Sequence, residues 1–96
     1  MMKRPARKLI RYAVCVDNGS GYYAVDLIPR KIYEIWPDAD GERHRQLRVV
    51  DESGEDYLYP AEYFRMLVLP AGVDRLIRSD YRKSVAGRRA ASKAGR

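Results

Sequence analysis

Short runs of apolar residues, separated by clusters of turn-forming residues, cover the chain from Leu9 to Leu69. Within these runs apolar side chains tend to recur at every second position, which is typical of β-strands with one buried face. Gly, Pro, Asn, Asp and Ser gather between the runs, where the chain has to reverse direction. The pattern predicts five short antiparallel strands, near 9–17, 31–36, 46–52, 56–60 and 65–69, with 22–27 in a hairpin-like excursion.

The back half of this pattern, residues 46–69, is its most informative part. Gly54 lies in an acidic turn between two predicted strands and can adopt a positive φ without steric cost. Pro60 cannot donate a hydrogen bond to a neighbouring strand, so it ends the strand before it. Residues 61–64 have the length of a single helical turn, after which the chain becomes apolar again. The predicted order is therefore strand, tight turn, strand, one helical turn and strand.

Alternation also predicts which side chains fill the core. In the first strand Tyr12, Val14 and Val16 share one face, which we expect to point inward. In the fourth strand we expect Leu58 to point inward and its two neighbours to point outward. The predicted core consists of Val14, Val16, Ile35, Leu47, Val49, Leu58 and Leu67.

The character of the sequence changes after Pro70. Four apolar residues recur there at helical spacing: Val73, Leu76, Ile77 and Tyr81. They predict an amphipathic helix over 72–84, with this face buried on the strand domain or on a partner. The remaining residues are small, basic and low in complexity, with little to bury. The predicted organisation is a basic N-terminal arm (1–8), one small all-β domain (9–70), an amphipathic helix (71–84) and a basic tail (85–96).

Two segments carry a resemblance to a known fold. Residues 54–64, GEDYLYPAEYF, are similar to the final hairpin, single 3-10 turn and last strand of SH3 domains, where a Pro and a Tyr occupy that turn. The segment KIYEIWPD, followed by a loop and LRVVDESGEDYLYP, resembles a class of short, uncharacterised bacterial proteins. The resemblance implies a small five-stranded SH3-like β-barrel over 9–70. Such barrels bind peptides or nucleic acids or act as accessory subunits. The ALYDY-like motif of signalling SH3 domains is missing, so binding of PxxP peptides is not expected.

Aromatic residues are numerous for this length, with eight Tyr, one Trp and one Phe. If Leu58 points inward, Tyr57 and Tyr59 stand on the outer face of the sheet. With Tyr63 and Trp36 they would form an aromatic patch of the type that SH3-like barrels use for ligands, and Tyr and Trp are common interface anchors. The alternative is that the rings cover the core of a small barrel and keep their hydroxyls in water. The candidate partner-binding residues are Trp36, Tyr57, Tyr59 and Tyr63.

Charge is divided sharply along the chain. Residues 1–12 carry five Lys/Arg, residues 75–96 carry eight against one Asp, and residues 13–74 carry six basic and twelve acidic residues. Any attraction to a polyanion would therefore come from the ends. Such ends suit nucleic acid, an anionic membrane surface or an acidic protein, or serve solubility alone. The candidate nucleic-acid-binding residues are Arg4, Arg7, Lys8, Arg82, Lys83, Arg88 and Arg89.

The sequence contains no recognisable catalytic or metal-binding constellation. Cys15 and His44 are too few for a zinc site and lack the setting of a nucleophile and its base. Asp38 begins a DADG run, but Val49 stands at the twelfth position, where a calcium loop needs Glu. The acidic residues of 51–56 form either a cation or basic-partner site or a solvated turn. We therefore expect neither enzymatic activity nor a cofactor.

Compartment and function class follow from the same observations. A single cysteine excludes an internal disulfide, and no apolar run approaches the roughly 20 residues of a spanning helix, which fits a cytoplasmic protein. The sequence favours a non-catalytic binding module, an adaptor or accessory subunit that engages a protein through the aromatic face and the C-terminal helix. The alternative is a sequence-independent nucleic-acid-associated protein that binds through its basic ends. The pattern leaves the oligomeric state open.

Overall fold

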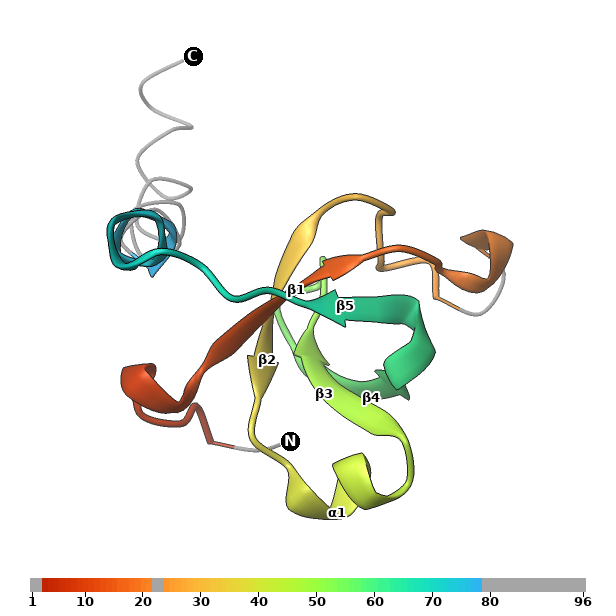
Figure 1. Ribbon diagram of the computed structural model, residues 1–96. Helices are drawn as coiled ribbons and strands as arrows, with labels where there is room; N and C mark the ends of the chain where they lie inside the picture. Colours follow the sequence, from red (N-terminus) through yellow and green to blue (C-terminus); the bar gives the residue numbers. More distant parts are fainter. Residues whose placement is uncertain (1–2, 22–23, 79–96) are drawn as a thin grey trace, which may run out of the picture.

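Five antiparallel strands form one curled sheet. The computed structural model describes residues 3–21 and 24–78. The sheet has the order β4-β3-β2-β1-β5, so that β1 lies between β2 and β5. It curls into a half-barrel, with a short C-terminal helix outside it (Figure 1). The strands are β1 (Arg11–Cys15), β2 (Ile32–Trp36), β3 (Gln46–Val50), β4 (Asp56–Pro60) and β5 (Phe64–Met66).

Each of the five predicted strands is present, although most are shorter than predicted. The 3-10 turn η3 (Ala61–Tyr63) connects β4 to β5, as the spacing of residues 60–64 predicted. Gly54 has a φ of 86° in the turn between β3 and β4, the left-handed conformation that glycine adopts most easily. The backbone N–H of Ala61 donates to the carbonyl of Arg45 at 2.9 Å and holds η3 against the start of β3.

The long connection between β1 and β2 is a loop that caps one end of the half-barrel. It contains a short 3-10 turn, η2 (Gly19–Gly21), and its described residues 24–27 form no strand. Ala24 and Leu27 are nevertheless buried, because the loop folds back and inserts both side chains into the core. The Asn18 amide holds this return by donating to the carbonyl of Leu27 at 3.0 Å. The predicted excursion is therefore a loop, and Tyr22 and Tyr23 lie outside the described residues.

The polar connection between β2 and β3, residues 37–45, is partly helical. It contains a short helix, α1 (Ala39–Arg43), which Asp38 caps by accepting a hydrogen bond from the N–H of Gly41 at 2.9 Å. Gly41 is buried, and a Cβ atom at this position would lie 2.8 Å from Cδ2 of Leu58. A glycine here therefore allows α1 to approach β4 closely.

The main core lies on the concave face of the sheet. Ile35, Leu47 and Val49 are buried there, as predicted. Tyr33 and Phe64 pack edge to face with ring centroids 6.4 Å apart. The other members of this cluster are Ala13, Cys15, Ala24, Leu27, Tyr59 and Tyr63.

Four of the core predictions were wrong. In β1 the inward residues are Ala13 and Cys15, while Val14 is only half-buried and Val16 is 45% exposed. The concave face already holds several large rings, so small side chains fit best on this part of β1. In β4, Tyr59 points inward and Leu58 is half-buried on the opposite face. Leu67, also half-buried, lies beyond the end of β5.

A second, smaller apolar cluster covers part of the convex face. It consists of Ile10, Tyr12, Trp36 and Val50, with Ile77 packed against it. Ile77 belongs to the C-terminal helix, which is described over 71–78. Within that range the predicted helix is confirmed, and it docks through Ile77, whereas Val73 and Leu76 remain 44% and 63% exposed. Tyr81, the end of the predicted helix and the tail 85–96 lie outside the described residues.

Candidate nucleic-acid interface

The aromatic residues predicted to bind a partner do not form an exposed patch. Tyr59 and Tyr63 are each 8% exposed within the main core, and Trp36 is 7% exposed in the convex cluster. Only Tyr57, at 48%, presents much of its ring to solvent. Placing Tyr59 on an outer aromatic face was therefore wrong. The rings instead cover the cores on both faces of a small sheet, as in the alternative that the sequence left open. That alternative kept the hydroxyls in water, whereas the hydroxyls of Tyr33 and Tyr59 bind carboxylates of the fold.

The buried hydroxyl of Tyr59 binds the acidic turn between β3 and β4. It donates to the carboxylate of Asp51 at 2.6 Å, and Asp51 also accepts from the backbone N–H of Ser53 at 2.9 Å. Glu52 pairs with Lys31 at 2.7 Å and accepts from the hydroxyl of Tyr33. These carboxylates are thus bound to partners within the fold. In the part of the chain that the structure describes, no group of three potential metal-ligating side chains comes together.

Arg48 connects α1 to the last hairpin. Its Nε lies 2.8 Å from the carboxylate of Asp38, and its Nη1 lies 3.1 Å from that of Asp56, which is almost fully buried. The N–H of Gly41, followed by the Arg48 guanidinium, lowers the pKa of Asp38 below its ordinary value. Arg48 and the two aspartates are therefore a structural element of the fold.

Neither Cys15 nor His44 is set up for catalysis. Cys15 is fully buried in the core, and this burial raises the pKa of its thiol, which disfavours the reactive thiolate. His44 is exposed at the end of α1, where its Nδ1 lies 2.8 Å from the carbonyl of Asp40. The two residues do not form a nucleophile and base pair.

The N-terminal arm and the described part of the C-terminal helix lie against each other. The N-terminal arm forms a 3-10 turn, η1 (Arg7–Leu9), and the C-terminal helix lies against it. The Arg78 guanidinium donates from Nη1 to the carbonyl of Arg7 at 2.7 Å and from Nη2 to the carbonyl of Ile10 at 2.9 Å. These contacts join positions 71 and 68 residues apart in the sequence.

Arg78 is fixed from two further sides. Its Nε donates to the carboxylate of Asp74, one helical turn earlier, at 2.8 Å. Its Cζ lies 5.1 Å from the centroid of the Tyr12 ring, a cation–π geometry. Burial, with a smaller effect of Glu34, raises the pKa of the Tyr12 phenol, so the ring stays neutral at physiological pH. The guanidinium is therefore bound to helix, arm and sheet together.

The beginning of the arm is anchored separately. Arg4 donates to the buried carboxylate of Glu34 at 2.9 Å, and the indole N–H of Trp36 donates to the other oxygen of the same carboxylate at 2.9 Å. Because Glu34 is buried in the middle of β2, this pair ties the arm to the convex face. Arg4 thus has a structural contact in addition to its predicted role.

The exposed charges around this junction form the basic end, defined here as Arg7, Lys8 and Arg75. All three residues are exposed, and none forms an ion pair with another residue that the structure describes. Arg7 and Lys8 come from η1, and Arg75 comes from the helix that Arg78 holds against η1. The predicted residues Arg82, Lys83, Arg88 and Arg89 lie outside the described residues.

The sequence prediction did not identify Arg78, Tyr12 and Glu34 as the residues that bring the ends together. One signal was available: Asp74 and Arg78 are four residues apart, the spacing of an ion pair along a helix. The hydrogen bonds from Arg78 to backbone carbonyls could not be predicted from the sequence, because every residue has a carbonyl group.

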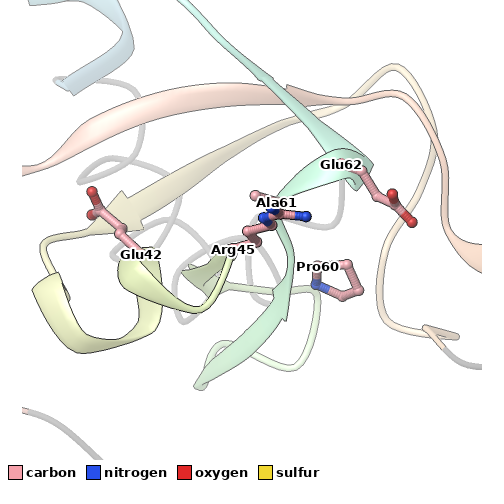
Figure 2. Close-up of a pocket in the computed structure, with 5 residues that line it drawn as sticks. All are labelled: Glu42, Arg45, Pro60, Ala61 and Glu62. Carbon is pink, nitrogen blue, oxygen red and sulfur yellow. The ribbon is translucent and has the colours of Figure 1, made fainter.

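A shallow depression lies between α1 and η3. It is lined by Glu42, Arg45, Pro60, Ala61 and Glu62. Figure 2 shows the two carboxylates on opposite sides of the Arg45 side chain. Glu42 is already paired with Arg11 at 2.9 Å. The mixed charge of the lining favours neither an anionic nor a cationic ligand.

No family model, curated protein or solved structure matches the chain. No helix within residues 3–21 and 24–78 has the length and apolarity needed to cross a membrane.

Proposed function

We propose that this chain is a small, non-catalytic binding module with an SH3-like barrel, which associates with nucleic acid independently of sequence. The barrel assignment is supported by the position of β1 between β2 and β5 and by the 3-10 turn between β4 and β5. Because such barrels serve many functions, the assignment of a ligand rests on the surface and not on the fold.

The assignment of nucleic acid as the ligand rests on the contact between the N-terminal arm and the C-terminal helix. Charges that are distant in sequence act together on a polyanion only if the fold brings them close. The bond of 2.7 Å from Arg78 to the carbonyl of Arg7 joins the two segments. The exposed side chains of Arg7, Lys8 and Arg75 form no ion pair with another described residue. The basic tail follows directly from the same helix in sequence.

The same surface predicts how the nucleic acid is bound. Arg and Lys side chains contact phosphates, and the released counterions make the affinity depend strongly on salt. Such contacts position the protein on the backbone and carry no information on the base sequence. Binding of single strands usually adds stacking on aromatic rings, but Tyr57, an exposed ring, lies beside the carboxylate of Glu55. We therefore expect duplexes to be bound at least as well as single strands.

A fluorescence-anisotropy titration tests this function. We expect micromolar or tighter binding to two unrelated duplexes of about 20 base pairs, with equal affinities. If about five charges meet phosphates, the slope of log K against log salt is about −4 to −5. Deletion of residues 85–96 lowers the affinity and flattens the slope. Absence of binding at about 50 mM salt would remove the proposal.

A protein partner is the second candidate, because the helix that docks through Ile77 leaves two apolar side chains exposed. Val73 is 44% and Leu76 is 63% exposed on the helix outside the sheet. Exposed apolar residues on one helix are a common basis for partner binding. This candidate predicts salt-tolerant binding that Leu76→Ser weakens. Affinity capture with and without nuclease separates the two candidates, since only nucleic-acid-mediated capture is lost on digestion.

A further inference from the structure

We propose that Arg78 is a positioning residue, which assembles the basic end without offering its own charge to phosphate. The inference rests on the proposed function and deepens it, because it names the residue on which the shape of the binding surface depends. Its basis is that the guanidinium of Arg78 is already occupied, while the exposed cations around it are not.

Most of the N–H donors of the Arg78 guanidinium have partners within the fold. An Arg side chain has five N–H donors in a planar fork. In this structure Nε, Nη1 and Nη2 each have a partner, at 2.8, 2.7 and 2.9 Å. The side chain is only 17% exposed, and one side of its plane is turned to the ring of Tyr12. Two N–H donors remain on this largely buried guanidinium, so a phosphate can bind it less strongly than it binds an exposed Arg side chain with all five donors available.

The two carbonyl groups that accept hydrogen bonds from Arg78 belong to the segment around η1. The turn η1 has three residues, none of them buried, and no side chain caps its N-terminus. A turn of this kind has little stability alone. Nη1 and Nη2 bind the carbonyls of Arg7 and Ile10, which lie at the start of η1 and directly after its end. Arg78 therefore fixes both ends of the segment that carries Arg7 and Lys8.

Arg78 also orients the C-terminal helix. Its contact with the convex cluster is made by Ile77, and Asp74 accepts a hydrogen bond from Arg78. The carboxylate of Asp74 would otherwise add negative charge to the basic end. By pairing with it, Arg78 neutralises this charge and orients the helix that carries Arg75. A surface whose charges are held in place before binding loses less entropy when it meets a nucleic acid.

Lysine cannot reproduce this arrangement. A single ammonium group keeps the positive charge but lacks the planar fork that reaches two carbonyls and a carboxylate together. The substitution Arg78→Lys therefore removes the positioning while the net charge stays constant. Arg30→Lys is the matched control, since Arg30 lies outside the basic end, is exposed and forms no ion pair with another described residue.

The experiment is an anisotropy titration of the full chain and both variants against a random 20-base-pair duplex at four salt concentrations. We expect Arg78→Lys to weaken binding about tenfold, the range of a modest coupling between two segments. We also expect its salt slope to be flatter by about one, because fewer phosphates are contacted together. Arg30→Lys should stay within about twofold of wild type. A general loss of folded protein would lower the apparent affinity without changing the slope.

Amide exchange without nucleic acid gives an independent readout. Arg78→Lys should accelerate exchange in residues 73–78 and leave β2 and β3 unchanged, whereas Arg30→Lys should change neither. The inference is overturned if exchange or affinity is the same in Arg78→Lys and wild type. It is also overturned if the two Lys variants weaken binding equally, or if Arg78→Lys leaves the salt slope unchanged. Failure of the wild-type chain to bind removes the proposed function and the positioning role with it.

Discussion

At the residue scale, hydrogen bonds between polar atoms determine whether some side chains are buried or exposed, which the apolar alternation left open. Tyr57 and Tyr59 are equivalent in a strand pattern, yet one is exposed and the other buried. The difference in exposure comes from Asp51, whose buried carboxylate accepts a hydrogen bond from the hydroxyl of Tyr59 at 2.6 Å. The sequence could predict a turn at 51–56, because the residue types favour it. It could not predict that one turn carboxylate folds inward to meet a tyrosine.

This pair gives the first prediction. Tyr59→Phe leaves a buried carboxylate without one of its donors, which should lower the free energy of unfolding by about 1–3 kcal/mol. Tyr57→Phe removes an exposed hydroxyl that reaches Glu55, and its effect should stay within about 0.5 kcal/mol. Urea unfolding followed by circular dichroism measures both variants. Equal stabilities of the two variants would mean that the Asp51–Tyr59 contact is not made in solution.

The second prediction concerns pH and Asp38. Its pKa is lowered in the folded state, so its contacts stabilise the fold above the ordinary value of 3.8, and this stabilisation is lost as the pH falls through the folded value. Asp38→Asn keeps a capping oxygen for α1 but cannot form an ion pair with Arg48. The variant should be less stable than wild type above about pH 5, and the difference should shrink below the ordinary pKa. Urea titrations at three pH values measure it; a constant difference would contradict the ion pair.

At the element scale, strand existence was predictable and strand orientation was only partly so. The alternation in β3 placed Leu47 and Val49 correctly, because its concave-facing positions carry the apolar residues there. In β1 both faces are covered: Ala13 and Cys15 meet the main core, while Tyr12 meets the helix and arm. A strand buried on both faces carries no clean alternation. The size of the residue, and not its apolarity, then decides its direction.

Strand β2 allows a matched test of orientation with one residue type. Ile35 is fully buried in the main core, whereas Ile32 is 44% exposed on the opposite face. Ile35→Ala should lower the free energy of unfolding by about 2–5 kcal/mol. Ile32→Ala should cost about 1 kcal/mol or less, since much of its surface already meets water. Thermal or urea unfolding distinguishes them, and a larger loss for Ile32→Ala would reverse the assignment of the two faces.

The C-terminal helix shows a related limit. Helical spacing predicted an apolar face containing Val73, Leu76 and Ile77, and the structure describes helix over 71–78. Only Ile77 of these three packs on the convex cluster, because Arg78 and Asp74 orient the neighbouring face toward the arm. Periodicity finds the apolar side of a helix but not the polar bonds that rotate it.

At the scale of the whole molecule, the sequence predicted an acidic body with basic ends but not their arrangement. Their contact depends on bonds from one guanidinium to two backbone carbonyls, and on a buried carboxylate, Glu34, that receives Arg4. Three of the four aromatic residues that the sequence offered as a partner surface are buried, and Tyr57 is the exposed one. The exposed charges of the N-terminal arm and of the described helix therefore gain weight as the candidate for function, since Arg78 holds these two segments together.

The central claim is that this location, and not the net charge, determines binding. Two triple variants that each remove three positive charges test it most directly. The first is Arg7→Ala, Lys8→Ala and Arg75→Ala in the basic end. The control is Arg30→Ala, Arg45→Ala and Arg65→Ala, three exposed residues outside the basic end. Both have the same formal net charge, so long-range electrostatic effects are matched.

The measurement is the dissociation constant for a random duplex, by anisotropy, over a series of salt concentrations. The account predicts that the basic-end variant loses at least about tenfold in affinity at 50 mM salt and that its salt slope flattens by about two to three. The control variant should remain within about threefold of wild type, with an unchanged slope. Equal losses in the two triple variants, or a larger loss in the control, would contradict the claim that the junction of the two chain ends is the binding surface.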